Sequence, residues 1–521
     1  MSGADIAPDG RARRGRDRRA RVWRAPAGLA RAPRDQAPTT AVVGGGLAGL
    51  AAATALAERG VRVTLYEREY QLGGRLAGWP IELADGSTAT MTRGFHAFFR
   101  QYYNLRGLLR RVDPGLTMMT GLPDYPLRHS TGFQDSFAKV PRTPPWSALG
   151  FAARSPTFGW RDLARMNARA ALPLMDVRVP GIYRRLDRIS AQELLARIRF
   201  PPAAHHLAFE VFSRSFFADP RRLSAAELAL MFHIYFLGSS EGLLFDVPQE
   251  PFPAALWEPL AIYLDAHGVD IRTGHAVENV EPAQAGGFHV TTRDSEMRHD
   301  TVVLALDTAG LRHVVARSPR LGAPDWRDRI ARLTTAPPFL VSRLWLDRPV
   351  SCDRPGFLGT SGYGPLDNVS VLERWDGEAL RRVARTGGSV VELHAYAVER
   401  TAHRTAVQEQ LKDQLRRLYP ETRDAEIVDE RHEWRADCPL FAVGGYHDRP
   451  TVRTTDPALT VAGDLVRIGL PAALMERAVT SGFLAANALL ERWGLAGQTL
   501  WSVPDRGRTP ALRVLNRLAG T

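Results

Sequence analysis

Three glycines and one acidic residue near the start of the chain have the types and spacing needed to bind a dinucleotide. Gly44, Gly46 and Gly49 follow the pattern G-x-G-x-x-G, and Glu67 stands eighteen residues after the last of them. The first glycine permits a tight turn, the second lets a pyrophosphate approach the backbone, and the third allows close packing of a helix on a strand. The acid would accept hydrogen bonds from ribose hydroxyls.

The elements around these residues form the frame that such a site needs. Residues Thr40–Val43 read as a short apolar strand, Leu47–Arg59 as an alanine-rich helix ended by Gly60, and Val61–Glu67 as a second strand. The helix would point its unpaired N–H groups and the positive end of its dipole at the pyrophosphate. A glycine pattern alone would be weak evidence, so the prediction depends on its coincidence with a complete strand–helix–strand unit.

Two further segments, far apart in the chain, suit the same site. Gly73-Gly74-Arg75 offers exposed backbone beside a fixed cation that can face phosphate or flavin. Near the other end, Leu459–Asp464 reads as a buried strand, and a helix with apolar periodicity follows from Met475 onward. Because the first and last of these elements belong to one nucleotide fold, we predict a discontinuous domain that binds a flavin along its length.

These motifs resemble the FAD-dependent amine oxidase and carotenoid desaturase superfamily. The signals are G-x-G-x-x-G with its acid, GGR, a predicted β-meander over 268–307, and a late AGD followed by M-E-R-A-V-x-S-G. The resemblance implies FAD as the cofactor, with Val277 contacting adenine through its backbone amide. It assigns the following residues to FAD binding: Gly44, Gly46, Gly49, Glu67, Gly74, Arg75, Val277, Gly463, Asp464, Ala478 and Val479.

Longer runs outside the flavin motifs narrow the resemblance to one branch. Thr92–Leu116, Val140–Trp146 and His206–Asp246 are similar to bacterial isorenieratene synthases, the β-carotene desaturase/methyltransferases, and the likeness runs from about Thr39 to Leu490. It implies conversion of the β-ionone end ring of β-carotene into a trimethylphenyl ring. This change needs two two-electron oxidations per ring and an internal shift of one methyl group, so no methyl donor is required.

Such a reaction would pass through a substrate cation, which needs apolar walls and one proton acceptor. Aromatic faces can stabilise a cation, and nine aromatic residues are expected to form the pocket, with ordinary core packing as the alternative: Phe95, Phe98, Phe99, Phe216, Phe217, Phe232, Tyr235, Phe236 and Phe245. Glu241, His233 and His96 remain open as alternative catalytic bases. No metal is expected, because the two cysteines and His205-His206 lack a ligand pattern.

The predicted fold is α/β: a discontinuous Rossmann-like FAD-binding domain with an inserted α+β substrate-binding domain, similar to amine oxidases and phytoene desaturases. A chain of 521 residues, 45% hydrophobic and 24% charged, is long enough for two to four domains. We assign 39–120, 255–312 and 438–492 to the FAD domain, 121–254 and 313–437 to the substrate domain, and 493–521 to a C-terminal tail.

The net charge of +12 does not by itself indicate a nucleic-acid partner. Half of this charge falls in residues 1–38, which contain ten arginines and four aspartates. The apolar residues of this segment show no helical or strand periodicity. This segment is predicted to be a disordered basic arm. Nucleic-acid binding through the arm stays a rival hypothesis, and it would show a steep salt dependence that disappears when the arm is removed.

A carotenoid substrate resides in the bilayer, yet the cleanest apolar run, Leu228–Gly238, has eleven residues where about 20 are needed to span it. We therefore expect a cytoplasmic enzyme, peripheral on the inner face of the cell membrane. The predicted interfacial surface, with a buried helix as the alternative, is Trp146, Leu149, Phe151, Phe158 and Trp160 with Arg154 and Arg161. A quinone is the electron acceptor we name, with oxygen left open.

Three other enzymatic readings remain open at this stage. One is a carotenoid desaturase or isomerase that moves no methyl group. Another is an amine oxidase, which would want an aromatic cage at the flavin and would release hydrogen peroxide. The third is a flavin-dependent mutase without net oxidation, which net electron transfer to an acceptor would exclude.

Overall fold

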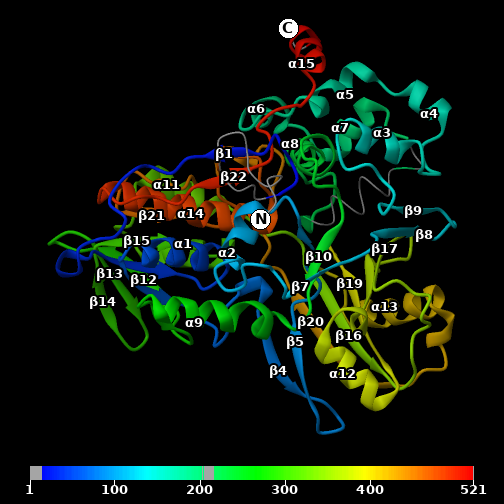
Figure 1. Cartoon of the computed structure of the whole chain (residues 1–521), viewed down its shortest axis with the longest axis horizontal. Coiled ribbons are helices and arrows are strands. Elements are labelled where there is room, and N and C mark those ends of the chain that lie inside the picture. The colour runs from blue at the N-terminus through cyan, green and yellow to red at the C-terminus, as the bar shows by residue number, and fades with distance from the viewer. Residues whose placement is uncertain (1–14, 202–203, 205–215, 520–521) are drawn as a thin grey trace.

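A parallel sheet of five strands forms one side of the computed structural model, which describes residues 15–201, 204 and 216–519 (Figure 1). Its strand order is β11-β3-β2-β15-β21, and every neighbouring pair is parallel. The strands are β2 (Thr39–Val43), β3 (Arg62–Tyr66), β11 (Asp270–Arg272), β15 (Thr301–Leu304) and β21 (Leu459–Val461). Because β2 and β21 come from opposite ends of the chain, the prediction of a discontinuous nucleotide fold is confirmed.

Two helices pack together against this sheet. They are α1 (Leu47–Glu58) and α14 (Leu474–Arg492). Helix α1 begins at the predicted residue and ends one residue before the predicted end, and α14 begins one residue before the predicted start. Their backbones approach closely, since a Cβ on Gly482 would stand 2.2 Å from the carbonyl oxygen of Ala48. Four other helices complete this region: α2 (Tyr103–Leu109), α9 (Glu258–Ala266), α10 (Thr308–Arg317) and α11 (Pro324–Arg332).

The predicted β-meander is present beside the parallel sheet. It consists of β12 (Val277–Pro282), β13 (Phe288–Thr292) and β14 (Glu296–His299), paired antiparallel in that order. The chain passes directly from β14 into β15 of the central sheet. The meander therefore places Val277, its first residue, next to the ends of the parallel strands.

A second, larger sheet lies on the other side of the molecule (Figure 1). Its order is β20-β16-β19-β18-β17-β8-β9, antiparallel except for the parallel pair β17–β8. The strands are β8 (Pro126–His129), β9 (Gln134–Ser136), β16 (Phe339–Leu346), β17 (Phe357–Ser361), β18 (Asn368–Val371), β19 (Ser389–Ala395) and β20 (Ile427–Arg435). All seven lie in the ranges assigned to the substrate domain, and α12 (Gly377–Thr386) and α13 (Arg404–Leu418) accompany them.

Short helices form a third group, at the upper right of Figure 1. They are α3 (Trp146–Ala152), α4 (Trp160–Arg165), α5 (Ala168–Met175), α6 (Gly181–Leu186), α7 (Ala191–Ile198), α8 (Ala225–Phe232), the π-helical segment His233–Leu237 and the C-terminal α15 (Pro510–Ala519). Two small sheets connect the groups: β6 (Phe98–Phe99), β10 (Phe245–Pro248) and β7 (Met119–Gly121), and the hairpin of β4 (Gly78–Glu82) and β5 (Thr88–Thr92).

Residues 15–38 have defined partners, so the prediction of a disordered arm is wrong for this part of the segment. Strand β1 (Arg21–Trp23) pairs antiparallel with β22 (Leu500–Ser502) of the C-terminal segment. Asp17 is buried and accepts two hydrogen bonds of 2.9 Å from Arg508. The arm is held by partners distant in sequence, which its own composition cannot reveal. Residues 1–14 lie outside the described residues.

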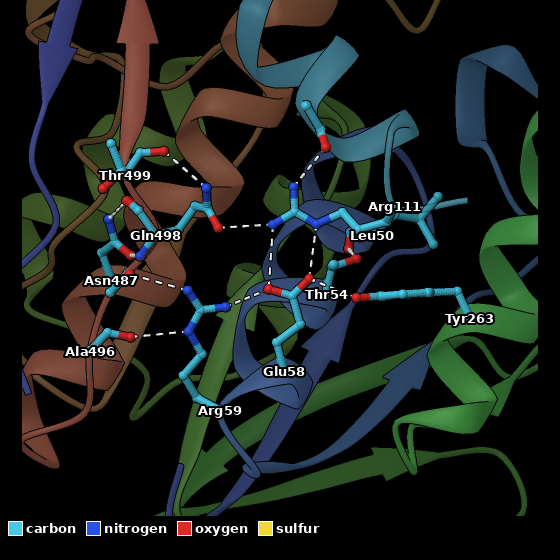
Figure 2. A network of polar contacts seen from close by, with 12 residues as sticks. Leu50, Thr54, Glu58, Arg59, Arg111, Tyr263, Asn487, Ala496, Gln498 and Thr499 are labelled. Atoms are coloured by element: carbon cyan, nitrogen blue, oxygen red, sulfur yellow. Dashed lines mark hydrogen bonds and ion pairs between the residues drawn. The ribbon is translucent and has the colours of Figure 1, made fainter. Parts of the chain in front are cut away.

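A polar network fastens the C-terminal segment to the end of α1 (Figure 2). Glu58 accepts hydrogen bonds from Arg111 (2.9 Å) and from the hydroxyl of Tyr263 (3.0 Å). Arg111 also donates to the side chain of Gln498 (2.8 Å), and Arg59 contacts Glu58. Burial raises the pKa of Glu58, but the hydrogen bond and charge of Arg111 outweigh it and lower that pKa. The carboxylate therefore stays ionised and ties α1, α2 and α9 to the C-terminal chain.

Candidate active site

One cavity of about 1110 Å³ runs from the parallel sheet to the second sheet. It begins at Val43, Tyr66 and Ala305, at or just beyond the carboxyl ends of β2, β3 and β15. Ligands bind at this edge in open α/β sheets. Nine of the eleven residues predicted to contact FAD line it: Gly44, Gly46, Glu67, Gly74, Arg75, Val277, Gly463, Asp464 and Ala478. Gly49 and Val479 are buried behind its wall.

The glycines make a bare backbone cradle at the start of α1. Gly44 has a φ of +113°, and a Cβ there would stand 2.4 Å from the carbonyl oxygen of Ala305. A Cβ on Gly49 would stand 1.8 Å from the carbonyl oxygen of Gly44, so helix and turn can approach only with glycine there. Gly46 is the N-cap of α1 and supplies no side chain to cap it. The first N–H groups of α1 therefore remain for an anion, as the spacing predicts.

Glu67 occupies the position of a ribose-binding acid. It is buried at the end of β3 and faces the cavity. One carboxylate oxygen accepts from the N–H of Gly45 (2.7 Å) and the other from the N–H of Glu69 (2.9 Å). Burial raises the pKa of Glu67 above its ordinary value, while these two backbone hydrogen bonds act against the rise. Each oxygen keeps a further lone pair for a ribose hydroxyl.

An ion pair joins the two distant ends of the chain at the cavity wall. Arg75 of the GGR motif donates to Asp464 of the AGD motif over 2.7 Å. Burial would lower the pKa of Arg75, but the charge of Asp464 raises it well above its ordinary value, so the guanidinium is a fixed cation. Beside it, Ser481 on α14 accepts a hydrogen bond of 2.9 Å from the N–H of Gly463. Both motifs are thereby held in one arrangement.

These residues fit FAD. A Cβ on Gly74, whose φ is +58°, would stand 3.2 Å from the Cα of Gly46, so the cradle between the two loops is open only because both residues are glycine. The cradle suits a pyrophosphate, Glu67 suits a ribose and Arg75 suits an anionic or electron-rich group. FAD bound there supplies a two-electron acceptor for hydride.

The far end of the cavity is lined by aromatic side chains. They come from loops, from the small β6–β10–β7 sheet and from the seven-stranded sheet: Phe95, Phe99, Tyr102, Tyr125, Phe217, Phe245, Phe339, Phe357 and Tyr396. Phe95 stacks on Phe357 with ring centroids 4.2 Å apart, and Phe245 meets Phe95 edge to face. Four of the nine predicted pocket aromatics are among them. The other five, which do not line the cavity, are Phe98, Phe216, Phe232, Tyr235 and Phe236.

Of the three candidate bases, only His96 lines the cavity. Its Nδ1 lies 2.9 Å from the carbonyl oxygen of Gly94, which can only accept, so Nδ1 carries the proton. Burial lowers the pKa of His96 to about 4, with the charges of nearby cations adding to the effect. The imidazole is therefore neutral at physiological pH, with Nε2 as a weak acceptor.

Glu241 and His233 lie away from the cavity and bind other parts of the chain. Their positions do not support the prediction that either is the catalytic base. Glu241 accepts hydrogen bonds from the N–H of Asp17 (2.9 Å) and the hydroxyl of Tyr103 (3.0 Å), so it anchors the N-terminal segment. His233 is fully buried, and its Nε2 donates to the carbonyl oxygen of Pro504 over 2.6 Å. Neither residue lines the cavity.

Sequence reasoning missed several residues that do line it. Arg93 and Asp437 form an ion pair of 2.5 Å, and His394, Tyr396 and Asn368 come from the second sheet or its edge. For His394 and Tyr396 a local signal exists, a strand of buried residues with polar side chains at alternate positions over 389–396, whereas Asn368 lies outside that segment. Which cavity those residues face depends on strand pairing over long sequence separations.

Comparison with known proteins identifies the family of the chain. Residues 47–490 match the family model described as flavin containing amine oxidoreductase. The chain is 72% identical over 507 residues to the carotenoid phi-ring synthase of Streptomyces griseus, covering 97% of this chain and 98% of the relative. It is 27% identical to the carotenoid phi-ring synthase of Chlorobaculum tepidum, covering 89% of this chain and 90% of the relative.

A solved structure of putrescine oxidase bound to putrescine shares the fold, with a TM-score of 0.63 at 17% identity over 87% of this chain and 99% of that one. Fold and site together define an FAD-dependent oxidoreductase. The chain belongs to the flavin-containing amine oxidoreductase family, in the branch of the carotenoid phi-ring synthases. The resemblance drawn from the sequence is confirmed.

Proposed function

We propose that this enzyme desaturates the β-ionone end ring of β-carotene with a 1,2-methyl shift, giving an aromatic end ring. The observation that carries the proposal is the 72% identity to a carotenoid phi-ring synthase across almost the whole of both chains. The cavity supports it, because the FAD cradle continues without a break into an aromatic-walled end. A ring substrate there would lie beside the flavin, out of water.

The walls of the cavity suit the charge that such a reaction creates. Removal of a hydride from the ring leaves an allylic cation, a methyl group moves from the quaternary carbon to its neighbour, and proton loss completes each oxidation. The faces of Phe95, Phe357 and Phe245 stabilise a passing cation and exclude water that would trap it. The methyl group stays on the substrate, so the carbon count does not change.

We also propose that the enzyme lies on the inner face of the cell membrane and passes electrons to a quinone. None of the described helices is long and apolar enough to cross a bilayer. Large apolar side chains are exposed on the helical group instead: Trp146, Leu149, Trp160 and Leu163 on α3 and α4. Arg161 stacks over Trp160 at 5.1 Å, a pairing suited to an anionic surface.

Two members of the predicted membrane surface do not belong to it. Phe151 is buried, and Phe158 is only half-buried and packs edge to face on Phe200. Phe151 stacks on Phe137 with ring centroids 4.9 Å apart, so it anchors α3 to the body below. Burying one face of α3 in this way leaves Trp146 and Leu149 on the other.

Expression in a bacterium that accumulates β-carotene tests the proposed function. Chromatography and mass spectrometry of the pigment should show the loss of four hydrogens per ring with an unchanged carbon count. Unchanged β-carotene beside a purified protein that carries FAD would reject this substrate. A changed acyclic carotenoid would then favour a desaturase without methyl migration, and hydrogen peroxide released from an amine would favour an amine oxidase.

A further inference from the structure

Three polar side chains follow one another along the edge of the aromatic end of the cavity. Glu392 and His394 are on β19, and Tyr396 follows one residue after its end, so the alternation of a strand puts all three on one face. Glu392 Oε1 lies 2.8 Å from His394 Nε2, and His394 Nδ1 lies 2.7 Å from the hydroxyl of Tyr396. Glu392 and His394 are almost completely buried.

The carboxylate of Glu392 favours one tautomer of His394. Arg343 on β16 donates to Glu392 Oε2 from two nitrogens, at 2.6 and 3.0 Å. Burial raises the pKa of Glu392, but Arg343 and His394 outweigh it and bring the pKa to about 2. An ionised carboxylate can only accept, so His394 Nε2 carries a proton and Nδ1 accepts from Tyr396. Asn368 donates to the same phenolic oxygen over 3.1 Å.

This row of side chains stands between two cavities. His394 and Tyr396 line the main cavity. Glu392 and Arg343 line a second cavity of about 310 Å³, under the β4–β5 hairpin and α12. That cavity has a charged wall, formed by Asp376, Glu378, Arg381, Arg382 and Arg385. The exposed guanidinium of Arg381 shows that this side reaches solvent.

We propose that Tyr396, His394 and Glu392 carry the proton lost from the ring out of the dry cavity and into the second one. The inference rests on the proposed function. The ring C–H bond breaks and its electron pair forms the new ring double bond. The proton passes to the phenolic oxygen of Tyr396 while the phenolic proton moves to His394 Nδ1. The imidazolium is stabilised by Glu392 and gives its Nε2 proton to Glu392 Oε1, and the carboxyl group, which lines the second cavity, releases that proton to water there. The oxidant remains FAD.

The arrangement explains how a tyrosine with a raised pKa can act as a base. Burial raises the pKa of Tyr396 far above its ordinary value, so a free phenolate does not form. A coupled transfer to His394 avoids that state, because the phenol is neutral before and after it. His96 bonds the carbonyl oxygen of Gly94 instead of a carboxylate and holds a proton poorly, with a pKa of about 4. Tyr396 is accordingly the catalytic residue, and His394 and Glu392 are positioning residues that act through it.

Replacement of Tyr396 by phenylalanine tests the relay. The matched control is Tyr419→Phe, since Tyr419 is buried, its hydroxyl has no hydrogen-bond partner among the described residues, and it does not line the main cavity. Holoenzyme is mixed anaerobically with β-carotene, and flavin bleaching and product formation are followed separately. In Tyr396→Phe, bleaching should keep the wild-type rate while the product of the first two-electron oxidation, which has lost two hydrogens, forms about 100-fold more slowly. Tyr419→Phe should match the wild type in the rate of flavin bleaching and in the rate of product formation.

A solvent isotope effect separates a relay from a packing role. The proton that moves from Tyr396 to His394 exchanges with water, so product formation by the wild type should slow in D₂O, and Tyr396→Phe should lose that sensitivity. A Tyr396→Phe variant that forms product at the wild-type rate, or that keeps the isotope effect, would overturn the proposal. Slower bleaching and product formation by the same factor would assign Tyr396 to ring packing.

A last measurement is independent of any turnover. In holoenzyme labelled with ¹⁵N-histidine, with His394→Gln used for assignment, the His394 signals should show a protonated Nε2 and an unprotonated Nδ1. The opposite tautomer, with the N–H of Phe95 donating to Nε2 over its 3.3 Å separation, would refute the relay. If the wild-type enzyme fails to convert β-carotene, the proposed function is rejected. The tautomer of His394 still tests the hydrogen-bond arrangement of the relay, because its measurement needs no turnover.

Discussion

The two ends of the cavity are built from different parts of the polypeptide. At the cofactor end, the cavity wall is mainly backbone. Gly44, Gly46 and Gly74 have no side chains to fill the cradle, and the N-terminus of α1 presents unpaired N–H groups. At the ring end, the wall consists of side chains such as Phe95, Phe357 and Tyr396, which come from strands and loops far apart in sequence. A site made of backbone tolerates almost no added atom, whereas a wall of side chains tolerates replacement one residue at a time.

The largest effect is expected from one added methyl group at the cofactor end. In Gly49→Ala the new Cβ would meet the carbonyl oxygen of Gly44 at 1.8 Å, so α1 must move away from the turn that holds the pyrophosphate. Purified Gly49→Ala should contain no FAD, measured by absorbance after denaturation. Gly107→Ala is the control, because a Cβ there meets nothing within 4 Å, and this variant should keep FAD. FAD retained in Gly49→Ala would refute a backbone-made cradle.

The second effect concerns the contact between α8 of the helical group and α14, which packs against the parallel sheet. Glu227 on α8 accepts from Arg477 on α14 over 2.7 Å and contacts Arg449, and all three are buried. Glu227→Gln leaves two buried cations without their counter-charge and should lower the free energy of unfolding by about 3–5 kcal/mol. The control Glu409→Gln removes an exposed partner of Lys412 and should cost at most about 1 kcal/mol. Chemical denaturation measures both.

The same contact predicts a dependence on pH. Burial raises the pKa of Glu227, but Arg477 and Arg449 outweigh it and lower the pKa to about 2, against an ordinary value of 4.5. A depressed acid pKa adds stability that is complete above the unfolded value and is lost as pH falls from about 4.5 toward about 2. Glu227→Gln should lack this component of acid destabilisation. An equal acid loss in both proteins would contradict the assignment.

A smaller effect is expected at the ring end. Phe357→Leu keeps most of the apolar volume but removes the aromatic face that stacks on Phe95. Conversion of β-carotene should fall about tenfold, the size of one desolvated cation–aromatic contact, while FAD content stays unchanged. Phe288→Leu, in the core of the β-meander and away from the cavity, should convert at the wild-type rate. Loss of FAD in Phe357→Leu would show that the two ends are not independent.

The smallest effect lies outside the cavity. Trp160 is 74% exposed, and Ile262 on α9 is 71% exposed on a distant side of the molecule (Figure 1). Trp160→Ala should bind anionic phospholipid vesicles about threefold more weakly in sedimentation, because part of one large apolar side chain no longer enters the interface. Ile262→Ala should bind as the wild type does. Equal weakening by both variants would remove α4 from the membrane surface.

The contrast between the two ends also explains what the sequence could predict. Glycine spacing sets local geometry, so β2, α1 and β3 could be predicted from residues 39–75, and five of the nine predicted FAD contacts that line the cavity lie in the same segment. Phe357 and Tyr396 face the cavity because β17 pairs with β8, far earlier in the chain, and β19 pairs with β16 and β18. No pattern local to either residue carries that information.

Two errors have the same origin. Glu241 stands in an aromatic stretch that suits a catalytic base, yet it holds the N–H of Asp17, 224 residues away in sequence. The arginine-rich segment lacks an apolar period, yet β1 is ordered by pairing with β22. In both places a partner distant in sequence decides the structure, and the local composition carries no information about that partner.

Anaerobic mixing of purified holoenzyme with β-carotene in phospholipid vesicles tests the central claim most directly, because it asks whether the two ends of the cavity react with each other. We expect the absorbance band of oxidised flavin to disappear as β-carotene is consumed, with hydrogens lost from the ring and all carbons retained. A carotenoid that changes while the flavin stays oxidised throughout would contradict the account and indicate an isomerisation without net electron transfer.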